Sequence, residues 1–412
     1  MHSFSVLFLV FFALSIAVKF WLSQRHLSHI LKHRAQVPEA FREKISLEEH
    51  QKAADYTSTK IRFGRWPLLY DSLITLIWLF GGGLEFLDQT VRGYGLDPIY
   101  TGMLVIFSMM IISSLLDLPF SLYSTFVIEE KFGFNRTTLK TFILDIFKGV
   151  LLATVLGLPL IWVILWLMEQ AGELWWLYTW LVLTAFSLFI AWAYPTWIAP
   201  LFNKFSPLEE GETLNRINNL LSRCGFNSNG IFVIDGSKRS SHGNAYFSGF
   251  GKNKRIVFYD TLLESLNDDE LEAVLAHELG HFKRKHIVKG MAISFATTLV
   301  GLAILAWLMK NDWFYTALGV STPSTYMALL LFTLVTPVFT FLLSPVMSMF
   351  SRKNEFEADE FAAQQSDARY LIQALVNLYK ENANTLTPDP LYSAFYDSHP
   401  PAPVRIAHLN KQ

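Results

Sequence analysis

Long apolar segments recur along the chain, and each is long enough to cross a lipid bilayer as a helix, which takes about 20 residues. Seven segments meet this requirement, at 4–23, 67–87, 101–127, 145–168, 174–196, 287–309 and 325–350. In hydrocarbon, segments of this length satisfy their backbone polar groups by forming helices. The sequence therefore predicts a mainly α-helical integral membrane protein whose lipid partner is the bilayer itself.

Composition excludes several other classes of protein and site. Hydrophobic residues make up 52% of the 412 residues and charged residues only 17%, which is more apolar than a soluble domain. The net charge of −1 provides no basic surface for nucleic acid, so no nucleic-acid partner is expected. Cys224 is the single cysteine, so a metal site in this chain must use His, Asp or Glu.

The loops between the spans differ strongly in their Lys and Arg content, which sets the orientation in the membrane. The loop after the first span carries many basic residues between Arg25 and Arg65, whereas the loop after the second has only Arg92. The alternation continues and places the N-terminus outside, with the loops after spans 1, 3 and 5 and the C-terminal part in the cytoplasm. The first span lacks a signal-cleavage pattern and is interpreted as a retained anchor.

These boundaries divide the chain into four parts. Residues 1–196 hold spans 1–5, 197–286 form a cytoplasmic catalytic domain, 287–350 hold spans 6 and 7, and 351–412 form a cytoplasmic C-terminal part. In the second part, Ile231–Asp235, Asn244–Phe250 and Arg255–Asp260 have strand composition. With "GKNK" (251–254) as a turn, they predict a small antiparallel sheet.

The segment "LEAVLAHELGHFKRKH" (271–286) contains two histidines one helical turn apart. Asn267 and Glu270 form a capping-box pattern before it, which indicates a helix. On that helix the imidazoles of His277 and His281 lie on one face and can bind one Zn²⁺. Glu278 is then placed to take a proton from the water that zinc activates. The alternative, a chance pattern on an amphipathic helix, is the weaker interpretation.

A catalytic zinc needs a third protein ligand, and spans 6 and 7 return the chain to the side of the membrane that it left. There "SRKNEFEADEFA" (351–362) presents Glu355 as the candidate ligand. Asp359, one turn further, is placed to accept the N–H of a ligand histidine. Glu357 is expected to be solvated, and so is His286. A surface carboxylate on a charged helix is the alternative for Glu355.

Several segments together resemble the type I CAAX prenyl endopeptidases, which are integral-membrane zinc proteases. They are "FVIEEKFGFN" (126–135), "IAPLFNKF" (198–205), "GSKRSSHGNAYFSGFG" (236–251), "HELGHFKRKH" (277–286), "SRKNEFEADEFA" (351–362) and "SHPPAPVRI" (398–406). The resemblance implies one Zn²⁺ per chain on His277, His281 and Glu355, with Glu278 as general base. It also implies a seven-helix transmembrane bundle enclosing a chamber, closed by a cytoplasmic zincin-like α+β metalloprotease domain.

The same resemblance assigns further residues. It implies that Asn244, Ala245, Tyr246 and Phe247 align the substrate as an added strand, with the Asn244 amide near the scissile bond. It places His399 near the metal, where a histidine can stabilise a developing oxyanion.

The resemblance also places Arg405 near the metal. Its partner is left open between Asp359 and the surroundings of Glu278. Without the resemblance, an ordinary strand at 244–247 and a loop position for His399 are the alternatives.

The sequence thus predicts a monomeric membrane zinc metalloendopeptidase whose substrate is a peptide or protein, prenylated as in the resembled family. A membrane quality-control metalloprotease acting on non-prenylated substrates is the alternative enzyme. A transporter or channel with a vestigial metal site is the rival from another class. The somewhat short chain and its "HLNKQ" ending favour a bacterial inner membrane, with the endoplasmic reticulum membrane expected in a eukaryote.

Overall fold

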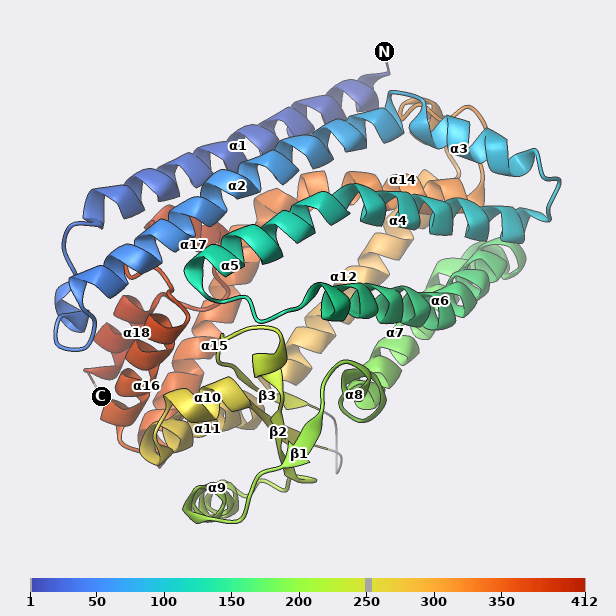
Figure 1. Cartoon of the computed structure of the whole chain (residues 1–412). Coiled ribbons are helices and arrows are strands. Elements are labelled where there is room, and N and C mark those ends of the chain that lie inside the picture. Colours follow the sequence, from blue (N-terminus) through green and yellow to red (C-terminus); the bar gives the residue numbers. More distant parts are fainter. Residues whose placement is uncertain (1, 249–253, 412) are drawn as a thin grey trace.

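The computed structural model describes residues 2–248 and 254–411 of the chain, and helices dominate these residues (Figure 1). Six helical segments are long and apolar enough to span a membrane, and a bent pair brings the number to seven. They contain α1 (Ser3–His33), α2 (Leu47–Leu79), α3 (Gly83–Arg92), α4 (Pro98–Tyr123), α6 (Leu139–Gln170), α7 (Trp175–Ala193), α12 (His286–Leu308), α14 (Thr325–Thr340) and α15 (Ser344–Gln365). The seven predicted spans are therefore confirmed.

The helix boundaries differ from the predicted spans because several helices continue into the polar parts. α2 begins at Leu47 with a complete capping box from Ser46 and Glu49, 20 residues before the predicted span. The second span is also broken, because α2 and α3 meet at an angle of 51°. Gly82, with φ of 78°, supplies the left-handed backbone conformation at this bend.

The membrane helices pack tightly at one end and separate toward the other. In α6 the buried side chains all lie between Ile164 and Met168, and in α4 they lie between Thr101 and Met109. Figure 1 shows the sheet and α11 at the end of the molecule opposite to α3. Only 11–39% of each span's most apolar window is buried, so most of these apolar side chains lie outside the packed core. The spans therefore enclose a chamber beside the catalytic domain.

The predicted sheet exists, but its topology is not the expected one. Four strands, β1 (Phe205–Pro207), β2 (Ile231–Ile234), β3 (Ala245–Ser248) and β4 (Arg255–Tyr259), lie in the order β1-β2-β4-β3. β2 and β4 pair in parallel, so the expectation of a purely antiparallel sheet is wrong. The parallel pairing arises because the chain between β2 and β4 crosses over and returns as the edge strand β3. Residues 249–253, which include most of the predicted turn, lie outside the described residues.

Short helices complete the polar half of the molecule. They are α5 (Glu130–Phe132), α8 (Ala199–Phe202), α9 (Glu212–Arg223), α10 (Asp260–Ser265), α11 (Asp268–Lys283), α13 (Asp312–Thr316), α16 (Ala368–Glu381), α17 (Pro390–Tyr396) and α18 (Ala402–Leu409). A buried apolar core joins α9, β2, β4, α11, α15 and α16. This core fixes α11 against α15, and those two helices carry the predicted metal ligands.

The contact between α11 and α15 is close enough to require glycine. A Cβ added to Gly280 would lie 2.9 Å from the Cα of Ala358 and 3.0 Å from its carbonyl oxygen. Ala358 itself is fully buried. The small residues thus let the two backbones approach, which brings side chains one turn away on each helix into contact.

Candidate metal centre

His277, His281 and Glu355 converge on one point between α11 and α15. The Nε2 atoms of the two histidines lie 3.2 Å apart. The Glu355 carboxylate oxygens lie 3.5 Å from His277 Nε2 and 3.2 Å from His281 Nε2. Among the described residues this trio is the group of candidate ligands that meets within 4.8 Å. The structure therefore brings together the three side chains that the sequence selected.

The chemistry of this trio fits a zinc ion. Two imidazole nitrogens and one carboxylate oxygen are a common protein ligand set of catalytic zinc. Glu355 is 3% exposed, and its Oε2 atom is buried without a hydrogen-bond donor, with Arg405 Nη1 at 3.7 Å, near the limit of an ion pair. Burying a carboxylate oxygen without a donor is costly unless a cation satisfies it. The residues present thus fit the metal that a metallopeptidase requires.

Asp359 and Arg405 support the trio from behind, and this settles the open question about Arg405. Arg405 donates to Asp359 through Nε at 2.9 Å and Nη2 at 2.5 Å. His277 Nδ1 lies 2.9 Å from Asp359 Oδ1, so its N–H donates to the same carboxylate. Arg405 Nη2 also lies 3.2 Å from His277 Nδ1, but both are donors when Nε2 faces the trio. Asp359 is therefore the acceptor that the two residues share.

These contacts shift the pKa values of the buried groups. Burial and the Arg405 charge lower the pKa of His277, but the neighbouring carboxylates of Asp359 and Glu355 outweigh them and raise it above its usual value. Burial likewise lowers the pKa of Arg405, and its bonds with Asp359 raise it by more. Arg405 therefore stays charged, and Asp359 keeps the His277 proton on Nδ1 and leaves Nε2 facing the trio.

A second support holds His281, and the sequence did not suggest it. His286 is only 6% exposed, and its Nδ1 lies 3.0 Å from Nδ1 of His281. On its other side, His286 Nε2 lies 3.1 Å from Glu357 Oε2. The expectation that His286 is solvated is wrong, because its ring is buried against Glu357 of α15, whereas Glu357 is still 28% exposed. The one available signal was their spacing, five residues after His281 and two after Glu355.

Glu278 and His399 lie beside the trio in different ways. Glu278 follows His277 on α11 and is half-buried. His399 comes from the segment between α17 and α18, and its Nε2 lies 3.4 Å from Glu355 Oε1. Its side chain is 66% exposed, so the ring can reach a bound molecule. His399 thus belongs to the centre rather than to a remote loop.

The predicted substrate-aligning residues form the edge of the sheet. Asn244 is exposed, and Ala245, Tyr246 and Phe247 lie on β3, which pairs with β4 on one side. Within the described residues, the other side of β3 faces no strand. A free strand edge of this kind can bind an extended peptide through backbone hydrogen bonds.

Comparisons with known proteins agree with this architecture. Residues 26–204 match the family model described as "CAAX prenyl protease N-terminal, five membrane helices". Residues 207–412 match the model of peptidase family M48. Together the two matches cover nearly the whole chain, and the second includes the last two spans as well as the candidate centre.

Named relatives match over most of their length. A CAAX prenyl protease 1 homolog of Arabidopsis thaliana is 37% identical, over 89% of this chain and 88% of the relative. The Homo sapiens homolog is 35% identical, over 94% of this chain and 91% of the relative. The crystal structure of S. mikatae Ste24p superimposes with a TM-score of 0.92 at 31% identity, covering 99% of both chains. The chain belongs to peptidase family M48, in its CAAX prenyl protease branch, and is an integral-membrane metallopeptidase.

Proposed function

We propose that this protein is a zinc metalloendopeptidase that removes C-terminal residues from prenylated, CAAX-type proteins at the cytoplasmic face of the membrane. The observation that carries the proposal is the convergence of His277, His281 and Glu355, with a buried Glu355 oxygen that lacks a donor. The names of the relatives support the substrate class, because each is called a CAAX prenyl protease 1.

The residues of the chain divide the work of peptide hydrolysis. His277, His281 and Glu355 would hold one zinc ion, which when bound polarises the scissile carbonyl and acidifies a water molecule. Glu278 acts as the general base for this water and then carries the proton to the leaving nitrogen. Asp359 fixes the tautomer and orientation of His277, and Arg405 holds Asp359 in place.

The substrate is positioned by groups on the two sides of the centre. The free edge of β3 (Ala245–Phe247) binds the peptide backbone, and the Asn244 amide lies near the scissile bond. His399 donates a hydrogen bond to the oxyanion that develops on the attacked carbonyl, a contribution of about 3 kcal/mol to the barrier for groups in this role. The protein acts as a monomer with one zinc per chain.

The proposed orientation places the centre on the cytoplasmic side. Residues from the basic loops after spans 1 and 3 meet the catalytic domain: Tyr56 donates to Glu129, and Glu129 lies 3.6 Å from His242. Basic loops stay in the cytoplasm both in a bacterial inner membrane and in the endoplasmic reticulum membrane. The proposal therefore gives the same orientation in either location.

A cleavage assay with a farnesylated CAAX peptide and its unlipidated twin tests this function. The wild-type protein should carry about one zinc per chain and cleave the farnesylated peptide faster, and a chelator should stop both reactions. Glu278→Gln should keep its zinc and lose at least about a hundredfold in kcat, because general-base catalysis contributes about 10²–10⁴-fold. A Glu278→Gln variant that cleaves as fast as wild type would contradict the mechanism.

A further inference from the structure

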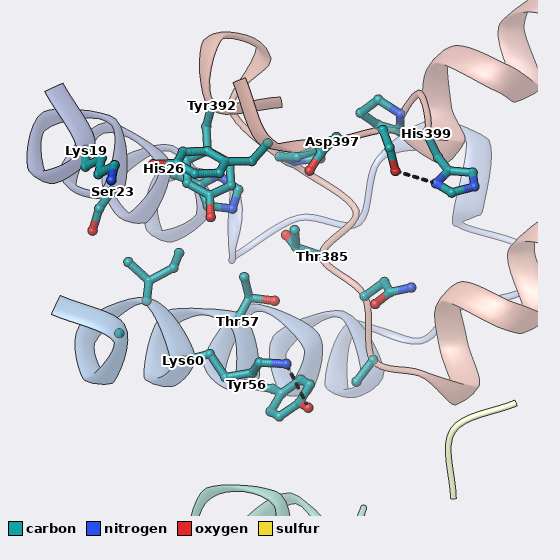
Figure 2. A pocket seen from close by; sticks show the side chains of 18 of the residues that line it. Lys19, Ser23, His26, Tyr56, Thr57, Lys60, Thr385, Tyr392, Asp397 and His399 are labelled. Atoms are coloured by element: carbon teal, nitrogen blue, oxygen red, sulfur yellow. Dashed lines mark hydrogen bonds between the residues drawn. The ribbon is translucent and has the colours of Figure 1, made fainter. Parts of the chain in front are cut away.

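A cavity of about 660 Å³ lies between α1, α2 and the segment that leads from α16 to α18. Its walls include Lys19 of α1, Lys60 of α2 and His399. Figure 2 shows Lys19 and His399 at opposite ends of this cavity. Because His399 also lies 3.4 Å from Glu355, the cavity begins at the metal centre and leads away from it.

The cavity carries an excess of positive charge. Lys19, Lys60 and Arg65 line it, against one carboxylate, Asp397. Among the described residues Lys19 and Arg65 make no ion pair: Lys19 Nζ lies 4.8 Å from the centre of the Phe341 ring, and Arg65 donates to Ser23 and Gln24.

Lys60 has an acidic neighbour, but the contact is weak. Its Nζ lies 3.9 Å from Glu129, at the limit of an ion pair, and 3.2 Å from the Tyr56 hydroxyl. Lys19 lies within the first predicted span (4–23), where a cation is costly and usually serves a ligand, whereas Lys60 and Arg65 belong to the basic loop after that span. The cavity is thus suited to an anionic group.

A second, larger cavity lies on the other side of the centre. It has a volume of about 1190 Å³, lies beside His281 and is lined mostly by apolar side chains, together with three lysines. The apolar residues include Phe186, Ile190, Phe247, Phe282, Ile287 and Val288, and the lysines are Lys254, Lys283 and Lys285. The two cavities therefore lie in the two directions in which a bound peptide can leave the centre, and the larger one offers the more extensive apolar surface.

The edge strand β3 connects these two cavities and gives the peptide a direction. Its Phe247 end lines the apolar cavity. Its other end follows Gly243, whose N–H donates to the Asn382 side chain at 3.1 Å. The residues directly after Asn382, Ala383–Thr385, line the cationic cavity. A peptide paired antiparallel to β3 would have its C-terminal part at this second end.

We infer that the cationic cavity binds the free C-terminal carboxylate of the substrate, with Lys19 and Lys60 as its recognition residues. The inference rests on the proposed peptidase function. It adds the direction in which the substrate binds and the substrate group that the cavity recognises, the C-terminal carboxylate. Three residues after the scissile bond span about 10 Å when extended, so a short C-terminal tail reaches from the centre into the cavity. The lipid-bearing residue then lies toward the apolar cavity.

The test compares a farnesylated peptide that ends in a free carboxylate with the same peptide ending in an amide. Wild type should prefer the acid by about tenfold or more in kcat/KM, mostly through KM, because a charge-assisted hydrogen bond contributes about 1.5–3 kcal/mol. The double variant Lys19→Met, Lys60→Met should lose this preference. Its kcat/KM should fall about 10–100-fold for the acid and less than about threefold for the amide.

Lys310→Met serves as the matched control, because Lys310 follows α12 at the far end of the spans and pairs with Glu173. It removes the same charge and should keep the wild-type preference. Poor folding of the double variant would lower both rates equally, so an unchanged acid-to-amide ratio in that variant overturns the inference. Equal wild-type rates for the two peptides also overturn the inference, and this is the result expected if an anionic lipid fills the cavity. The proposed peptidase function would then still stand. If wild type cleaves neither peptide, both proposals fall.

Discussion

At the scale of single residues, each ligand histidine is held by a chain of two further groups. Asp359 and Arg405 stand behind His277, and His286 and Glu357 stand behind His281. Asp359 and the His286 imidazole accept the N–H of His277 and His281, which keeps each proton on Nδ1 and turns Nε2 toward the centre. The two acceptors differ, because one is a carboxylate that Arg405 holds and the other is an imidazole that Glu357 holds.

Asp359→Asn tests the first of these chains. The side-chain amide of the variant can still accept one hydrogen bond. The substitution removes the negative charge of Asp359, which pairs with the buried Arg405. We expect zinc affinity to fall about 10–100-fold, as loss of such a partner usually causes. Competition with a chelator of known affinity measures this change. Asp367→Asn is the control, because Asp367 is a half-buried cap of α16 away from the centre. An unchanged zinc affinity in Asp359→Asn would refute the role of Asp359.

At the scale of elements, the metal centre depends on how closely α11 and α15 approach. Their separation is set at Gly280, where a Cβ would clash with the backbone of Ala358. Side chains at positions three or four residues away on one face then meet across the interface. The glycine of HELGH is therefore explained by packing and not by backbone flexibility, since it lies inside a regular helix.

Gly280→Ala should force the two helices apart. Overpacking at such a contact costs about 1–3 kcal/mol, and the displacement moves Glu355 away from the histidines. We expect a lower Tm and a reduced zinc content per chain, measured together on the purified protein. Gly290→Ala in α12 is the matched control, because a Cβ there meets nothing within 4 Å. Wild-type zinc content in Gly280→Ala would show that the helix contact does not set the ligand geometry.

At the scale of the whole molecule, the spans form a wall and the catalytic domain closes one end of it. Contacts such as the ion pair between Lys380 of α16 and Glu49 of α2, at 3.0 Å, join the C-terminal part to the first basic loop. The hydroxyl of Tyr56 in α2 donates to Glu129 and lies 3.5 Å from His242, close to the start of β3. Loops after different spans thus meet the catalytic domain at a single end of the protein.

The proposed orientation can be tested with single cysteines in a Cys224→Ala background. Lys310→Cys, in the loop after α12, should react with a membrane-impermeant maleimide on intact spheroplasts. Glu209→Cys, an exposed position before α9, should react only after lysis. We expect this labelling pattern because loops rich in Lys and Arg stay on the cytoplasmic side of the membrane. The reverse labelling pattern would place the metal centre outside the cytoplasm.

Local patterns carried most of the correct predictions. The spans follow from apolar length, the start of α11 from the Asn267–Glu270 capping box, and the ligand pair from a four-residue spacing on one helix. The position of Glu355 follows from the two membrane crossings between His281 and the next acidic helix. Each of these features depends on residues within one helix or on whether the number of intervening spans is even or odd. The sequence alone therefore determines them.

Other features were decided only by the tertiary structure. The parallel pairing of β2 with β4, the contact of His286 with Glu357, the choice of Asp359 as the partner of Arg405, and the cationic cavity join residues far apart in the chain. Such contacts depend on how α11, α12, α15 and α18 pack around one core, and no local spacing encodes that packing. The sequence therefore determined which side chains meet at the candidate centre, and the fold decided what orients them and which cavities lie beside them.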